Sequence, residues 1–312
     1  MSNPKGYNVD NLSNYIEVNK DVIIKDIVLG DGELKGSTIG DFSKQLGIKT
    51  SEVLNYLNVE PVLQEGRGCG FNPQGSNVFS EKKIDTAMAK YEDEFCYDSL
   101  LGSFNEYLVK VSAEEGDMPY EAEIMEQVKK GIQKEVERQV WLGDTSNSGR
   151  TDLINGLVTL ALAATGETIV STSEEGSTAY QRILDTYMAI PEKWVDNAVI
   201  YVSPAIFRAY AQDLVAKNYF HYEGENGELT DLFIPGSDVK VHKTNALAGS
   251  DYIYATVPTN VVYGCDMLDA KEVIDAWYDK TDEVMRIRCK FNFGVNTLFS
   301  DAVVLNSVNA GE

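Results

Sequence analysis

Histidine is scarce in this sequence, and no arrangement typical of a catalytic or metal site is present. Only His221 and His242 occur among 312 residues, and neither lies in HExxH spacing or beside a nucleophile. No GxSxG nucleophile elbow occurs. The four cysteines are widely scattered without CxxC spacing, which argues against zinc and redox motifs and indicates reduced thiols in a cytosolic compartment. We therefore expect a protein that is not an enzyme and that holds no cofactor.

Long apolar runs and an excess of cations are also lacking. No run approaches the ~18 apolar residues that cross a bilayer, and residues 1–10 lack the basic-then-apolar order of a signal peptide. The 27 Lys and Arg are outnumbered by 49 Asp and Glu, which gives a net charge of −22. Such a chain has no general attraction for nucleic acid or for an anionic membrane. Taken alone, the charge favours simple solubility as its explanation.

Three segments resemble ligand loops incompletely. Gly70 and Gly75 have the spacing of a phosphate loop, but Ser76 stands where its lysine belongs. The segment 144–155 places Asp144 at the start of a calcium-loop pattern, but Asn155 replaces the bidentate glutamate. The acidic loop 223–231 is interpreted as solvated, with a bridging divalent ion as the alternative. We expect no metal site.

The first part of the chain is predicted to be an arm followed by an extended excursion. Residues 1–59 show little core of their own, with two short helical patterns at 39–46 and 50–57 around Gly47. This hints at a helix-turn-helix, but its second helix has no arginine. Glycine and proline crowd 61–80, which indicates an extended or hairpin excursion. Residues 82–107 are interpreted as a strand that continues as a short helix.

A long helix follows, with a narrow apolar stripe. Its apolar residues recur at i+4, which places them on one side of a helix over 121–141; they are Ile124, Val128, Ile132, Val136 and Val140. The spacing predicts a charged helix that lies across a surface. The helix ends at Trp141 and a polar turn.

The second half alternates strands and helices. Helices are predicted at 153–164 and 179–189, and another starts at Ser203-Pro204, a favourable N-cap pair, and runs to about residue 218. Strands are predicted at 198–202, 239–243, 252–257 and 261–263, and a further one is predicted to begin at 277–278. Strict alternation from Met285 to Phe293 predicts a strand with one buried face and a cationic face. Gly294 is expected to break it, and strand character resumes at 298–299 and 302–305.

The order of these parts resembles the major capsid proteins of tailed double-stranded DNA bacteriophages, which have the HK97-type fold. The closing segments 290–295 and 299–304 look like the last peripheral strands of that family. The resemblance implies an α+β fold divided into an N-terminal arm, an extended E-loop, a peripheral domain with a spine helix at 117–142, an axial domain and closing peripheral strands. The corresponding ranges are 1–59, 60–85, 86–160, 161–275 and 276–312.

The resemblance implies assembly as the function. Subunits of the family self-assemble as hexamers and pentamers into an icosahedral shell that encloses double-stranded DNA without sequence-specific binding, in the cytoplasm of a bacterial host. An acidic lining would let packaged DNA slide. The arm is short and lacks sustained heptads, so a separate scaffolding protein is expected, with a portal and possible decoration proteins as further partners.

Candidate inter-subunit contacts follow from the same resemblance. Arg67 and Phe71 would anchor the extended loop on a neighbour, and Trp141, at the end of the spine helix, is a further candidate contact. The cationic strand face would meet an acidic spine helix or the DNA side; its residues are Arg286, Arg288 and Lys290. Some family members cross-link through an E-loop lysine, but 61–80 contains none, and Lys82 and Lys83 lie at its base. We expect no such cross-link.

Three alternatives remain at the level of sequence. An encapsulin-like nanocompartment has the same fold but a protein cargo. A metal-dependent hydrolase would use the many carboxylates, although histidine is scarce. A tail-tube protein fits the long helix poorly.

Overall fold

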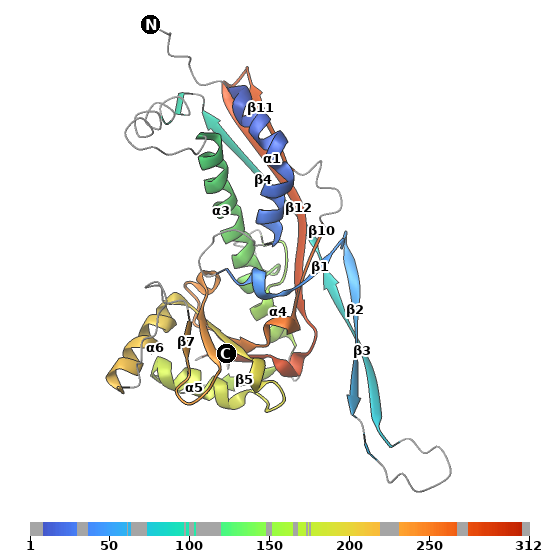
Figure 1. Ribbon diagram of the computed structural model, residues 1–312, viewed down its shortest axis with the longest axis vertical. Helices are drawn as coiled ribbons and strands as arrows, with labels where there is room; N and C mark the ends of the chain where they lie inside the picture. The colour runs from blue at the N-terminus through green and yellow to red at the C-terminus, as the bar shows by residue number, and fades with distance from the viewer. Residues whose placement is uncertain are drawn as a thin grey trace.

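The computed structural model shows an elongated molecule in which a long helix runs from one sheet to a second, and a hairpin projects from the body (Figure 1). The structure describes residues 9–29, 37–60, 62–63, 74–96, 98–99, 103, 120–147, 152–164, 168–172, 174, 176–218, 231–266 and 274–307. Within these ranges, no helix combines the length and the apolar character that crossing a membrane requires.

The long helix is confirmed as α3, Tyr120–Leu142, and it packs against a helix that the sequence reasoning missed. This helix, α1, runs over Val9–Leu29 within the expected arm. It buries Leu12, Ile16, Ile23 and Ile27 in the same core as Val136 and Val140 of α3. The N-terminal region therefore contributes substantially to the core.

Strand β12, Val284–Thr297, is the centre of a five-stranded sheet. On one side it pairs with β10, Val261–Asp266, and β11, Ile274–Asp279; on the other it pairs with β4, Ala87–Cys96. Strand β1, Ser43–Leu46, joins in parallel beyond β10. The alternation is confirmed, since Met285 to Phe293 are buried at every second position. The predicted break at Gly294 is wrong, because Gly294 pairs with Gly264 and the strand continues.

A six-stranded sheet forms the second unit, in the order β5-β13-β9-β6-β8-β7. The strands are β5 Ile169–Thr172, β6 Val199–Val202, β7 Asp231–Phe233, β8 Lys240–Lys243, β9 Ile253–Thr256 and β13 Val304–Ser307. One face buries its apolar residues against α5, Ala179–Ala189, and α6, Pro204–Ala216. The opposite face presents Tyr201 and Tyr254 to the end of α3. The sheet is thus sandwiched between helices.

Several predicted helices and one helix cap are confirmed, because residues close together in the sequence determine them. The helices at 179–189 and 153–164 are confirmed as α5 and as α4, Leu157–Ala163. The Ser203 cap is also confirmed, since its hydroxyl accepts a hydrogen bond from Ile206 N at 3.4 Å. Short 3-10 turns complete the described elements: η1 Ile39–Asp41, η2 Val195–Asn197, η4 Asn245–Leu247, η5 Pro258–Asn260 and η7 Ser300–Ala302.

Other predictions are wrong where long-range pairing decides the structure. The segments 39–46 and 50–57 are not two helices: η1 is followed by β1 and then β2, Ser51–Glu60, with Gly47 in the left-handed region at φ 87°. The prediction for 82–107 is partly confirmed: β3, Ser76–Asp85, is followed by a longer strand region than expected, β4, and residues 98–99 and 103 are helical. Strand β10 lies in the five-stranded sheet, and β13 lies between β5 and β9 in the six-stranded one.

Candidate functional site

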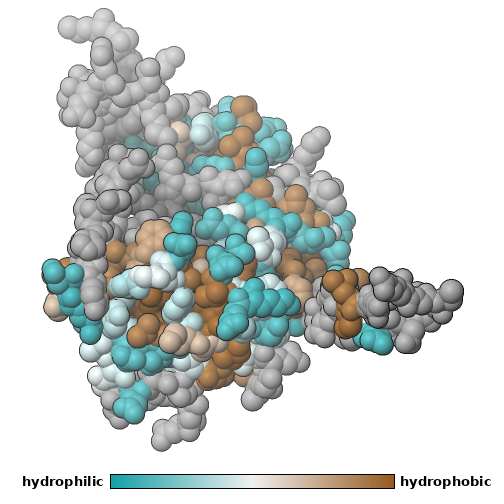
Figure 2. Space-filling view, turned by 60° about the horizontal axis from the view of Figure 1, so that its bottom comes forward, coloured by the Kyte–Doolittle hydropathy of each residue, from teal (hydrophilic) through white to brown (hydrophobic). Residues whose placement is uncertain are grey.

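The hairpin β2–β3 exposes apolar side chains. Its strands pair antiparallel from Ser51↔Asp85 to Glu60↔Ser76, and among the described residues no third strand pairs with them. Val53 and Leu57 are about half exposed, and Leu63, beyond the end of β2, is 97% exposed. The hairpin stands apart from the body and carries apolar surface (Figure 2). Because an isolated two-stranded ribbon is marginally stable in water, this segment needs a partner surface.

The base of the hairpin, by contrast, is fixed to the body. Leu54 and Ile84 are buried with Ile48 and Val262 in a small separate core. The amide of Asn296 donates to Lys83 O at 2.7 Å, which ties β3 to β12. Because its base is fixed to the body, the hairpin projects at a fixed angle, while its outer part stays uncovered.

Two glycines make this attachment possible. A Cβ on Gly294 would lie 2.3 Å from Asp85 O, and one on Gly264 would lie 2.8 Å from the Cδ1 atoms of Ile48 and Ile84. These paired glycines therefore allow the hairpin base to cross the sheet closely.

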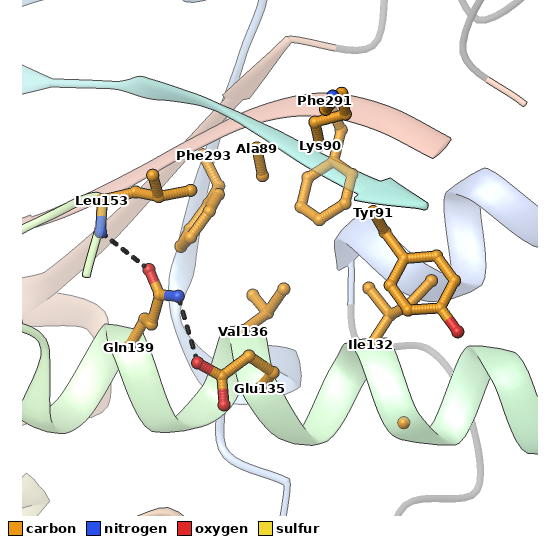
Figure 3. A pocket seen from close by; sticks show the side chains of 11 residues that line it. Ala89, Lys90, Tyr91, Ile132, Glu135, Val136, Gln139, Leu153, Phe291 and Phe293 are labelled. Carbon is orange, nitrogen blue, oxygen red and sulfur yellow. Dashed lines mark hydrogen bonds between the residues drawn. The ribbon is translucent and has the colours of Figure 1, made fainter. Parts of the chain in front are cut away.

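A pocket of about 230 Å³, here called the α3–β4 pocket, lies between the long helix and the five-stranded sheet (Figure 3). Ile132 and Val136 line it from α3, and Phe291 and Phe293 line it from β12. Its other walls come from β4 and from Leu153, which is 39% exposed. The pocket offers an apolar surface of the kind that receives side chains at protein interfaces.

A hydrogen-bonded wall closes one end of this pocket. The Gln139 side chain donates to Glu135 Oε1 at 3.1 Å and accepts from Leu153 N at 3.1 Å (Figure 3). Arg138 binds Glu135 and Asp152, and its hydrogen bond to Glu135 is the main reason that its pKa is raised. The charges at this end of α3 are thus largely paired within the subunit.

A second buried row on α3 was missed by sequence reasoning. Gln133, Glu137 and Trp141 recur at i+4 beside the apolar stripe, and all three are buried. Glu137 accepts hydrogen bonds from Thr38 N at 2.7 Å and Ile39 N at 3.1 Å, and Gln133 donates to Asp26 O at 2.6 Å. This row fastens the helix to α1 and to the segment that precedes β1. A search for apolar spacing did not find this row, because two of its three members are polar. The helix α3 is therefore more deeply buried than its apolar stripe alone indicates.

Trp141 lies within this core. It is completely buried, its Nε1 donates to Thr38 Oγ1 at 2.8 Å, and its ring centroid is 4.9 Å from that of Tyr201. Trp141 therefore joins α3 to the six-stranded sheet, and the suggestion that it contacts a neighbouring subunit is corrected. Arg67 and Phe71 lie outside the residues that the structure describes.

The cationic strand face is mostly neutralised by the subunit itself. Arg286 contacts Asp279 and lies 2.5 Å from Asp282. The guanidinium of Arg288 lies 3.1 Å from Glu92 and 4.9 Å from the ring centroid of Trp277.

These contacts also affect the acidic partners. The pKa of Glu92 is lowered, first by its hydrogen bond with Lys90 and then by Arg288. Lys290 is exposed and lies opposite Lys90 in the register.

The suspected ligand loops receive no support from the described residues. There, no three His, Cys, Asp or Glu side chains gather as a metal site would require. Asp144 Oδ1 instead accepts hydrogen bonds from the backbone and hydroxyl of Ser146, which forms a local turn. The loop 223–230 lies outside the described ranges.

Comparison with known proteins gives matches in structure alone. No protein-family model and no curated protein matches the sequence. A chain of the satellite phage P4 procapsid is similar over 98% of this chain and 92% of its own, with a TM-score of 0.61 and 8% identity. A chain of the capsid of a native GTA particle is similar over 88% of this chain and 91% of its own, with a TM-score of 0.57 and 12% identity.

A virus-like particle from Pyrococcus furiosus is also similar, over 93% of this chain and 98% of its own, with a TM-score of 0.51 and 9% identity. At such low identities these likenesses show the fold. The chain has the α+β fold of HK97-like capsid structures.

Proposed function

We propose that this chain is the major capsid protein of a tailed bacteriophage and self-assembles as hexamers and pentamers into an icosahedral shell around double-stranded DNA. One observation carries the proposal: a fold similar to a phage procapsid chain over 98% of its length presents a hairpin with a fixed base and uncovered apolar residues. Closed symmetry would cover such a surface in every copy.

The units of the structure take family roles within this proposal. The hairpin β2–β3, 51–85, corresponds to the E-loop and begins earlier than the expected 60–85. The five-stranded sheet with α1 and α3 corresponds to the peripheral domain, and the six-stranded sheet with α5 and α6 to the axial domain.

The outer part of the hairpin would pack on a neighbouring subunit. Leu57 and Leu63 are exposed on it, and Arg67 and Phe71, farther along the connection, remain candidate anchors. The α3–β4 pocket offers a matching apolar surface. Lys290 is the candidate for a cationic contact, because Arg286 and Arg288 already have partners.

Further partners belong to the proposal through the same family. A separate scaffolding protein, a portal and possible decoration proteins would act with the shell in the host cytoplasm, and the finished subunit would be part of the virion. The net charge of −22 supports enclosure of DNA without tight binding.

Electron microscopy of purified protein tests the proposal. Negative-stain images, taken with and without added salt and divalent ions, should show closed shells or hexameric and pentameric rings. Leu63→Asp should prevent their formation while leaving the subunit folded, since the side chain is 97% exposed within the subunit. The matched variant Leu63→Met keeps an apolar side chain and should still assemble.

Uniform monomers of the purified protein alone would not exclude a subunit that waits for its scaffolding protein; uniform monomers that persist when the scaffolding protein is added would contradict self-assembly. Normal shells from Leu63→Asp would contradict the role of the hairpin.

A protein nanocompartment is the alternative that an observation favours. The likeness to the virus-like particle from Pyrococcus furiosus supports a shell without deciding its contents. Particles isolated from the native source should contain double-stranded DNA if the first proposal is right. A defined protein cargo without DNA would favour the nanocompartment.

A further inference from the structure

Gly131 lies in the middle of α3, where the packing of the subunit does not explain a glycine. A glycine within a helix is destabilising relative to alanine, because it loses more conformational freedom on folding. A Cβ at this position would have no heavy atom of the described residues within 4 Å, the helix's own backbone aside. Glycine also serves where a backbone is approached closely from outside. Gly131 therefore points to an approach by another molecule.

Gly131 is exposed and lines the α3–β4 pocket. Ala89 of β4 also lines the pocket and lies opposite Phe291 of β12 in the register. The rings of Phe291 and Phe293 point into the pocket from the sheet (Figure 3). Small residues on the helix and on β4 thus leave room in front of two aromatic rings.

The charged residues around this apolar centre are already paired. Lys90 lies 2.7 Å from Glu92, and Glu135 lies 2.6 Å from Arg138. Both Lys90 and Glu135 line the pocket and are about half exposed. An apolar centre with a polar rim is the arrangement found in protein interfaces. The pocket therefore suits an apolar side chain better than a charged one.

The chain itself carries such side chains at the outer end of the hairpin. Just beyond β2, Val62 is 52% exposed and Leu63 is 97% exposed. They do not reach the pocket of their own subunit, because the hairpin base is fixed. Strand β3 runs ten residues from the outer end to the base, which is about 33 Å. The chain then continues into β4, which carries the pocket away from the hairpin (Figure 1). The occupant must therefore come from a second copy.

We infer that the α3–β4 pocket of one copy receives Leu63 of a second copy, and that Gly131 lets the backbone of that copy approach α3. The inference rests on the proposed function, which supplies the neighbouring copy. A cavity of roughly 150 Å³ holds a benzene ring, so a pocket of about 230 Å³ holds a leucine side chain. Because the hairpin and the pocket are different surfaces, the contact passes head to tail from copy to copy, as a closed ring requires.

Gly131→Ala separates this role from a structural one. The substitution should raise the urea midpoint of the unassembled subunit, because alanine favours the helix and its Cβ meets open space. It should also raise the protein concentration at which particles form by about tenfold, because the methyl group overpacks the contact. Light scattering measures this concentration. Glu123→Ala, at an exposed position in the first turn of α3, should leave it unchanged.

Cross-linking between copies identifies the occupant. In a background with Cys69→Ser and Cys96→Ser, subunits with Leu63→Cys are mixed with subunits with Leu153→Cys, whose side chain lines the pocket. The scaffolding protein is added where assembly needs it, and a short bismaleimide is then applied. A dimer that joins the two positions is expected from the mixture and from neither variant alone. Met188→Cys, 76% exposed on α5 and outside the pocket, replaces Leu153→Cys in the matched control and should give no such dimer.

The outcomes separate this contact from the proposed function. Shells that form without the Leu63–Leu153 cross-link, or a Gly131→Ala subunit that assembles as readily as the unmodified one, would overturn the contact and leave the capsid proposal in place. Cross-linked pairs without shells would support the contact and count against the shell. Absence of both shells and cross-links, with the scaffolding protein present, would overturn both.

Discussion

Replacement of Glu137 should reveal how strongly α3 is fastened to the N-terminal region. The side chain is 4% exposed and accepts hydrogen bonds from Ser37 Oγ, Thr38 N, Thr38 Oγ1 and Ile39 N, at 2.5, 2.7, 3.0 and 3.1 Å. Glu137→Ala leaves two buried backbone donors without an acceptor, and each such group costs about 1–3 kcal/mol. The free energy of unfolding should therefore fall by about 3–5 kcal/mol, out of about 5–15 kcal/mol for a typical domain.

Graded substitutions separate the hydrogen bonds from the charge. Glu137→Gln keeps one carbonyl oxygen for Thr38 N and Ile39 N, so its loss should be only about 1–2 kcal/mol. Glu123→Ala removes an exposed carboxylate from the first turn of the same helix and should cost no more than about 1 kcal/mol.

The measurement is urea unfolding of the unassembled subunit, followed by tryptophan fluorescence, with midpoint and slope both fitted. The reasoning is refuted if Glu137→Ala lies within about 0.5 kcal/mol of the unmodified protein, the range of ordinary surface substitutions. Equal losses for Ala and Gln would show that the accepting oxygens are not the source of the stability.

Four further predictions concern packing and thiol chemistry. Gly294→Ala should lower the free energy of unfolding by about 1–3 kcal/mol, because its Cβ would lie 2.3 Å from Asp85 O. Gly131→Ala, which has open space around its Cβ, should raise the free energy of unfolding by about 0.5–1 kcal/mol. Urea unfolding measures both changes. Trp141→Phe should lower the free energy of unfolding by about 1–2 kcal/mol, because it removes the hydrogen bond to Thr38. An unchanged melting temperature would contradict this. Burial raises the pKa of Cys265 to about 11 and of Cys289 to about 12, so iodoacetamide at pH 8 should modify exposed Cys96 far faster than either, as read by peptide mass spectrometry. Because the native state then holds these protons more tightly than the unfolded state, stability should fall as pH rises from about 9 towards 12.

Local signals allowed much of the helical structure to be predicted. The i+4 stripe of α3 and the Ser203-Pro204 start of α6 lie within single helices, so neighbouring residues are sufficient to recognise them. The helix α1 carried a comparable signal, with Leu12, Ile16, Ile23 and Ile27 at helical spacings, and was overlooked among its many polar residues.

Partners distant in the sequence determined what could not be predicted. Strand β1 pairs with Val262 to Cys265, and without that partner its residues resemble part of a short helix. The cationic face was identified correctly on β12, but its neutralisation depends on Glu92 of β4 and Asp279 of β11, which only the register places beside it. Glu137 was missed because a buried acid with donors about a hundred residues away has no local pattern.

The position of β13 has a consequence for the order of events during translation. This strand lies between β5 and β9, although it is made after both of them. On the ribosome, β5 therefore lacks its hydrogen-bonding neighbour until residues 304–307 have emerged. Half-made chains carry an incomplete sheet with open edges, which is a template for misassociation and a natural target for chaperones. A nascent chain thus cannot offer the finished sheet to another copy until residue 307 has been synthesised.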